Sequence, residues 1–98
     1  MRSLEITVTP AAEADMQNIF EYIAQDNIHK ADEIIEKFEE KFSTIAQFPD
    51  SGFRKSYFLK RNVRECIVAK HYQIIYTTKD DKIYILRVLT GYQDIFNL

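Results

Sequence analysis

Several residue types that support specialised chemistry are scarce in this sequence, which has one cysteine, two glycines, two prolines and no tryptophan among 98 residues. The single Cys66 excludes an internal disulfide framework and a cysteine-based zinc site. Two glycines are too few for a glycine-rich phosphate-binding loop. His29 and His71 are too few, and too far apart along the chain, to indicate a metal site. We therefore expect neither a metal nor a cofactor.

Long apolar runs are also missing. No stretch approaches the roughly 18–20 apolar residues that a transmembrane helix requires, and the N-terminus lacks the basic segment and apolar core of a secretion signal. These absences predict a cytoplasmic protein without a membrane partner. Hydrophobic residues make up 46% and charged residues 29% of the sequence, which is the mixture of a soluble globular protein. With neither an internal repeat nor a linker, residues 1–98 are expected to form a single domain.

Charge is distributed unevenly along the chain. Residues 1–53 carry four basic against eleven acidic residues, a net charge of −7, whereas residues 54–87 carry nine basic against three acidic residues, a net charge of +6. A basic half on an acidic chain indicates an anionic partner on one face. The alternative is that the acidic residues form the solvated faces of helices and the basic residues mark strand edges that discourage aggregation.

The N-terminal residues predict a strand followed by a helix. Residues 3–9 alternate between apolar and polar side chains, which is typical of a half-buried strand. Thr9 is a good helix N-cap, and Pro10 is favoured at the first helical position because its missing N–H is not needed there. Apolar residues then recur at helical spacing, and the helix should end near Gln25.

A second helix should follow almost directly. Asn27 is a suitable N-cap, and apolar residues form one stripe over roughly five turns. The helix should end before Pro49, because the residue ahead of a proline avoids the helical conformation. Residues 10–47 are therefore predicted to form a helical hairpin with a very short connection.

The second half of the chain predicts a small sheet. After a loop at residues 49–52, segments rich in β-branched and aromatic residues indicate strands at Val63–Ala69, Tyr72–Thr78 and Ile83–Leu89. The polar residues 79–82 between the last two strands predict a tight turn.

The last strand should be central because both of its faces are apolar. Strict alternation would place Ile83, Ile85 and Leu89 on one face and Tyr84, Leu86 and Val88 on the other. We expect an α+β fold in which an N-terminal strand and a two-helix antiparallel hairpin accompany a small, mainly antiparallel sheet, with the helices packed on one face. The first strand is expected to pair with the C-terminal half of that sheet.

Chemistry-bearing side chains are concentrated in the sheet half. Cys66 lies in a strand, where a small apolar packing role is expected. Arginine binds phosphate through two parallel hydrogen bonds, and aromatic rings stack on bases, so a convergent group on an open sheet face would hold RNA. The candidates are Arg61, Arg64, Lys70, His71, Arg87 and Tyr92. The alternative is that Arg64 and Arg87 pair with acids such as Glu65 or Asp94.

Four segments resemble a known family when they are taken in order. They are VTPAAEADMQNIFEYIAQDN at 8–27, FPDSGFR at 48–54, Arg64 followed by HYQIIY at 71–76, and ILRVLTGYQDIF at 85–96. Together they span nearly the whole chain and resemble the RelE/ParE superfamily of toxins from bacterial type II toxin–antitoxin systems. The resemblance implies a compact α+β toxin fold, in agreement with the fold expected from the residues themselves.

The resemblance also implies one of two activities. RelE-like members are ribosome-dependent endoribonucleases that cleave mRNA, and ParE-like members inhibit DNA gyrase without being nucleases. Thr90 stands where nuclease members often have His or Arg, and Phe96 stands where a C-terminal Tyr is common; neither transfers a proton at neutral pH. The chain therefore resembles the ParE-like branch more closely.

Two alternatives stay open. In a nuclease, the catalytic groups would come from Arg64, Lys70, His71, Arg87 and Tyr92. In a degenerate family member, the chain would be a binding module without toxicity.

An antitoxin partner is implied by either toxic activity. In such systems a partly disordered antitoxin segment binds the toxin as a helix in a groove or as a strand added to a sheet edge. An acidic antitoxin would complement the basic segment through Arg54, Arg61, Arg64 and Arg87. A homodimer or a toxin–antitoxin hetero-oligomer is the expected assembly.

Overall fold

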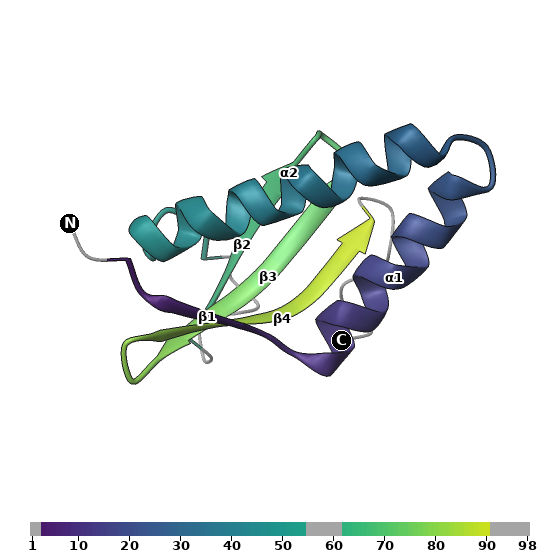
Figure 1. Cartoon of the computed structure of the whole chain (residues 1–98). Helices are drawn as coiled ribbons and strands as arrows, with labels where there is room; N and C mark the ends of the chain where they lie inside the picture. The colour runs from purple at the N-terminus through teal and green to yellow at the C-terminus, as the bar shows by residue number, and fades with distance from the viewer. Residues whose placement is uncertain (1–2, 55–61, 91–98) are drawn as a thin grey trace.

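A strand, two helices and three further strands follow one another along the chain, as a computed structural model describes for residues 3–54 and 62–90 (Figure 1). The sheet has the strand order β1-β4-β3-β2, with β1 parallel to β4 and the other pairs antiparallel. Both helices cover the same face of the sheet (Figure 1). The predicted α+β fold is therefore confirmed. The elements are β1 (Glu5–Val8), α1 (Pro10–Ala24), α2 (Ile28–Gln47), β2 (Val63–Val68), β3 (Tyr72–Lys79) and β4 (Lys82–Thr90).

The two helices begin at the predicted caps. The Thr9 side chain accepts a hydrogen bond from the Ala12 N–H at 3.3 Å, and the Asn27 side chain accepts one from the Lys30 N–H at 3.1 Å. Each cap satisfies one of the backbone donors that a helix start leaves without an intrahelical partner. The Thr9 hydroxyl also donates to the Ile85 carbonyl at 2.8 Å, so it ties the start of α1 to the middle of β4.

β4 is central, as predicted, because β1 pairs with one of its edges and β3 with the other. The parallel pairing with β1 runs only from Lys82 to Ile85, which faces Val8 at the end of the short strand. Beyond Ile85 that edge of β4 lies beside α1, with Thr90 at the end of the strand. Because β1 covers only the first part of this edge, the remaining part of β4 can make polar contacts with α1.

The strict alternation predicted for β4 is wrong at its C-terminal end. Tyr76 pairs with Ile85 while Ile75 pairs with Arg87, so Leu86 is an extra residue that forms a β-bulge. A bulge inserts one residue and moves every later side chain to the opposite face. Val88 consequently joins Ile83 and Ile85 in the core beneath the helices, and Leu89 lies with Leu86 in a smaller cluster on the other face.

The main core fills the space between the hairpin and the sheet. Phe38 and Tyr76 are its largest fully buried side chains. The Phe38 ring meets Tyr72 edge-on, with 5.3 Å between ring centroids, a favoured aromatic geometry. Cys66 is buried in the same core, and burial raises the pKa of its thiol. Its predicted packing role is thus confirmed.

Candidate functional site

Arg87 forms an ion pair with Asp15 of α1. Its Nε and Nη2 atoms donate to the two carboxylate oxygens at 2.7 and 2.9 Å, a two-bond geometry that strengthens the pairing of arginine with carboxylate. These hydrogen bonds raise the pKa of the Arg87 guanidinium. An ion pair was one of the two interpretations of this arginine, but its partner is Asp15 rather than Glu65 or Asp94.

The same carboxylate also completes the edge of β4. Asp15 Oδ2 accepts a hydrogen bond from the Val88 N–H at 3.0 Å. In a longer sheet, a carbonyl of a neighbouring strand would accept from this N–H. Since β1 stops opposite Ile85, the first turns of α1 lie next to this edge and supply the acceptor. Sequence reasoning missed the contact because 72 residues separate Asp15 from Arg87.

Arg64 braces the loop that follows α2. Its Nη1 donates to the carbonyl of Gly52 at 2.9 Å and to that of Asp50 at 3.3 Å, and its Nη2 lies 3.5 Å from the Asp50 carboxylate. Asp50 is largely exposed, so the two carbonyl contacts define the position of the guanidinium more firmly than the ion pair does.

Tyr76 holds the same loop from beneath. Its hydroxyl donates to the Pro49 carbonyl at 2.7 Å and accepts the Gly52 N–H at 2.9 Å. A Cβ placed on Gly52 would stand 2.6 Å from that hydroxyl, so any larger residue would force the buried tyrosine or the loop to shift. Burial raises the pKa of Tyr76. The tyrosine and Arg64 together give this loop a defined conformation.

Lys70 and His71 lie far from Arg64. Both are exposed in the turn between β2 and β3, where Lys70 adopts a left-handed backbone conformation with φ 67°. Arg64 lies near the start of β2 and Lys70 lies two residues beyond its end, and the strand from Arg64 to Val68 alone spans roughly 13 Å at about 3.3 Å per residue. These members of the predicted basic group therefore sit at opposite ends of β2.

Arg64 and Arg87 lie about 10 Å apart across the sheet, with β3 between their strands. One side chain reaches the loop after α2 and the other reaches α1. Arg54 is exposed at the end of that loop, and Thr90, half-buried, ends β4. Arg61, Tyr92 and Phe96 lie outside the described residues. Within residues 3–54 and 62–90, the structure does not bring the predicted catalytic side chains into one site.

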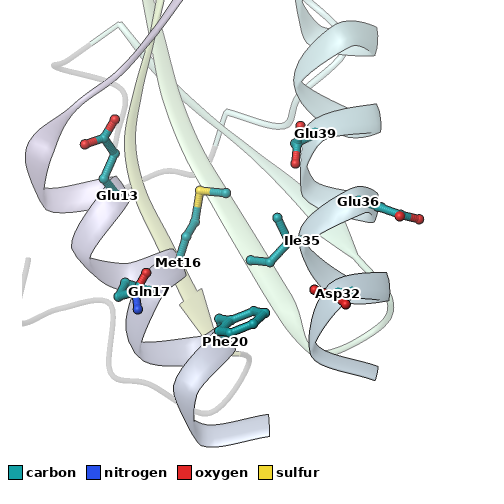
Figure 2. A pocket seen from close by; sticks show the side chains of 8 residues that line it. All are labelled: Glu13, Met16, Gln17, Phe20, Asp32, Ile35, Glu36 and Glu39. Carbon is teal, nitrogen blue, oxygen red and sulfur yellow. The ribbon is translucent and has the colours of Figure 1, made fainter. Parts of the chain in front are cut away.

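A hollow lies elsewhere, between α1 and α2 (Figure 2). We call it the hairpin groove; its volume is about 560 Å³. Three apolar and four acidic side chains dominate its lining, which consists of Glu13, Met16, Gln17, Phe20, Asp32, Ile35, Glu36 and Glu39. The apolar stripes predicted for the two helices did not reveal the groove, because it exists only where the two helices meet.

Smaller hollows along the sheet are lined by described residues. One, of about 270 Å³, lies between α1 and the C-terminal end of β4 and includes Asp15, Tyr22 and Thr90. The other, of about 400 Å³, lies between α2 and β2 and includes Lys37 and Lys41. Among the residues that the structure describes, no arginine or histidine lines either of them or the hairpin groove.

No cation site or membrane span is formed by the part of the chain that the structure describes. Over residues 3–54 and 62–90, no three side chains among His, Cys, Asp and Glu come together as metal ligands would. Over the same residues, neither helix is long and apolar enough to cross a bilayer.

The fold and the arrangement of its polar side chains define a small α+β protein with a helical hairpin on one sheet face. Residues 6–95 match the family model described as the ParE toxin of the type II toxin–antitoxin system, parDE. The chain therefore belongs to the ParE toxin family, within the RelE/ParE superfamily that the sequence resembles. A search of curated protein sequences finds no match.

Solved structures of similar fold come from several bacteria. A chain of the chromosomal ParDE system from P. aeruginosa is 20% identical with a TM-score of 0.74, over 90% of this chain and 96% of that one. A chain of the RelBE2 toxin–antitoxin complex from Mycobacterium tuberculosis is 15% identical with a TM-score of 0.59, over 90% and 98%. A conserved hypothetical protein from Helicobacter pylori is 20% identical with a TM-score of 0.58, over 92% and 97%. At these identities the similarity shows the fold.

Proposed function

We propose that this ParE-family toxin inhibits growth by binding DNA gyrase, without catalysis, and that a cognate antitoxin neutralises it. The observation that carries the proposal is the separation of Arg64, Lys70, His71 and Arg87 in the structure. Catalysis of RNA cleavage needs proton-transfer groups and cations around one reacting phosphate. Side chains at opposite ends of β2 and on both sides of β3 do not meet that requirement.

The contacts of the two arginines support the same conclusion. Arg87 donates hydrogen bonds to both carboxylate oxygens of Asp15, and Arg64 donates to backbone carbonyls of the loop after α2. A guanidinium already paired with a carboxylate offers less positive charge to a phosphoryl transition state. Both arginines are held by contacts within the fold, and inhibition then depends on surface binding. Gyrase is a bacterial enzyme of the cytoplasm, where we place this chain.

The antitoxin is proposed to carry an acidic segment that binds near the loop after α2. Arg54 is exposed there, and Arg64 lies beside it. Arg54, Arg61 and Arg64 are the proposed contacts, while Arg87 contributes through the part of its side chain that Asp15 leaves exposed. The double variant Arg54→Glu/Arg61→Glu should weaken antitoxin binding about tenfold or more, because like charges meet across the interface. Unchanged affinity by calorimetry would overturn this placement.

Two reactions run with the purified chain test the target. The first contains gyrase, ATP and relaxed plasmid, and the second contains programmed ribosomes and mRNA. We expect lost supercoiling with intact mRNA. Cut mRNA with normal supercoiling would establish the nuclease alternative, and Arg64, Lys70, His71, Arg87 and Tyr92 would then be replaced one at a time.

A chain inert in both reactions, and harmless when induced in bacteria, would instead be a binding module. Antitoxin added before gyrase should restore supercoiling. Failure of a tightly bound antitoxin to do so would contradict neutralisation.

A further inference from the structure

The hairpin groove has the shape of a docking site for a helix. Its lining residues follow the same spacing on both helices: Glu13, Met16, Gln17 and Phe20 on α1, and Asp32, Ile35, Glu36 and Glu39 on α2. Positions three, four and seven residues apart form one face of a helix. Seven residues at about 1.5 Å each give a trough roughly 10 Å long. That length matches about two turns of a partner helix, whose side chains would enter the hollow.

Apolar side chains form the floor of the groove. Figure 2 shows Met16, Phe20 and Ile35 pointing from the two helices into the space between them. Met16 and Ile35 pack against the main core from above and remain partly exposed. Apolar side chains of a partner would remove this surface from water, which is the favourable part of helix-in-groove binding.

Carboxylates form the rim. Glu13, Asp32, Glu36 and Glu39 are all exposed, and the described lining contains no Lys, Arg or His. A rim of one charge attracts a partner of the opposite charge and repels one of its own. A second copy of the chain placed groove to groove would bring two such acidic rims together. The occupant is therefore a helix with an apolar stripe and flanking basic residues.

We propose that the hairpin groove is the surface that binds DNA gyrase, and that it receives a basic amphipathic helical segment of that enzyme. The inference rests on the proposed function. An enzyme that holds DNA presents Lys and Arg to phosphates, and the groove offers carboxylates to the same side chains. The proposed antitoxin segment is acidic, so the rim would repel it. Target and antitoxin thus use different faces of the toxin.

A pair of charge-reversal variants on α2 tests this assignment. Glu36→Lys/Glu39→Lys changes the groove rim, and Glu33→Lys/Glu40→Lys changes two exposed residues of the same helix outside the groove. Both pairs alter the net charge equally. Each protein is assayed for half-inhibition of supercoiling, for direct gyrase binding, for antitoxin affinity and for its oligomeric state. Thermal melting confirms that each variant is folded.

The groove variant should need about tenfold more protein or greater for half-inhibition, because like charges meet at the interface. Its antitoxin affinity should be unchanged, and the control pair should behave as wild type. Phe20→Ala removes an apolar side chain from the floor of the groove. This variant should also inhibit gyrase more weakly than the wild type, and its antitoxin affinity should be unchanged.

Other outcomes separate the two claims. If the wild-type chain inhibits gyrase and the groove variant inhibits it equally well, the groove assignment is overturned and the proposed function stands. Loss of antitoxin affinity in the groove variant alone would assign the groove to the antitoxin. A wild-type dimer that the groove variant converts to a monomer would assign it to a second copy. A wild-type chain that leaves gyrase unaffected would overturn the proposed function and this inference together.

Discussion

Asp15 should contribute more to the stability of this protein than other acidic residues of α1. Its carboxylate accepts two hydrogen bonds from Arg87 and one from the Val88 N–H, and only 13% of its side chain is exposed. The Asp15→Ala variant removes all three bonds. It also leaves Val88 without its acceptor and Arg87 without its counter-charge.

The expected loss follows from these contacts. A hydrogen bond to a charged group contributes about 1.5–3 kcal/mol, and stranding a buried backbone donor costs about 1–3 kcal/mol. Because 35% of the Arg87 side chain is exposed, water screens part of the ion pair and can solvate the freed guanidinium. The free energy of unfolding should therefore fall by about 2–3 kcal/mol, which is less than the sum of the separate contributions. For a domain of this size the melting temperature should fall by roughly 10–20 °C.

Urea unfolding followed by circular dichroism measures the loss. Glu21→Ala is the matched control, because it removes an exposed acid of the same helix whose carboxylate accepts a hydrogen bond from the Gln17 side chain. Its effect should stay within about 0.5 kcal/mol. Asp15→Asn, which keeps an oxygen for Val88 but loses the charge, should fall between the two. An Asp15→Ala variant as stable as the control would refute the role assigned to this carboxylate.

Four further predictions concern the loop after α2 and the core. Gly52→Ala should destabilise by about 1–3 kcal/mol in urea unfolding, since its Cβ would meet the buried Tyr76 hydroxyl at 2.6 Å and the Glu65 carbonyl at 3.0 Å; wild-type stability would contradict this close packing. Tyr76→Phe should cost about 1–3 kcal/mol because it strands the Gly52 N–H. Burial raises the pKa of Tyr76, so the fold favours the neutral phenol. The stability that this group contributes is therefore complete below the unfolded pKa and is lost as the pH rises above about 10. Tyr76→Phe should reduce the alkaline loss of melting temperature, and an alkaline slope identical to that of the wild type would contradict this. Burial raises the pKa of the Cys66 thiol, so labelling with a disulfide reagent should be slow in the native protein and fast in denaturant, whereas equal rates would place the thiol at the surface.

Separate binding faces would have a consequence for regulation. If the antitoxin binds by the loop after α2 and gyrase by the hairpin groove, neutralisation cannot depend on direct competition for the same side chains. The antitoxin would then act by steric exclusion around the toxin or by changing the hairpin. A ternary complex in size-exclusion chromatography would favour the second route, and mutually exclusive binding would favour the first.

Features with local causes could be predicted from the sequence. Thr9 and Asn27 start the helices through hydrogen bonds that reach only three residues along the chain. The apolar spacing of the helices and the two apolar faces of β4 follow from periods of 3.6 and 2 residues. The four sequence segments, taken in order, predicted the family that the family model confirms over residues 6–95. The central position of β4 also followed, because a strand covered on both faces must lie inside a sheet.

The features on which the proposed function rests depend on residues distant in sequence. The bulge at Leu86 reverses the face of Val88 and Leu89, and no alternating pattern reports an inserted residue. Asp15 reaches Arg87 only because β1 ends early and α1 takes its place along β4. Arg64, Lys70 and Arg87 belong to one basic segment of the sequence, and the meander places them on different strands or at different strand ends. The acidic groove exists only where two helix faces meet. Local hydrogen bonding and periodicity therefore determined the elements, and strand register and helix packing decided which charged side chains lie together.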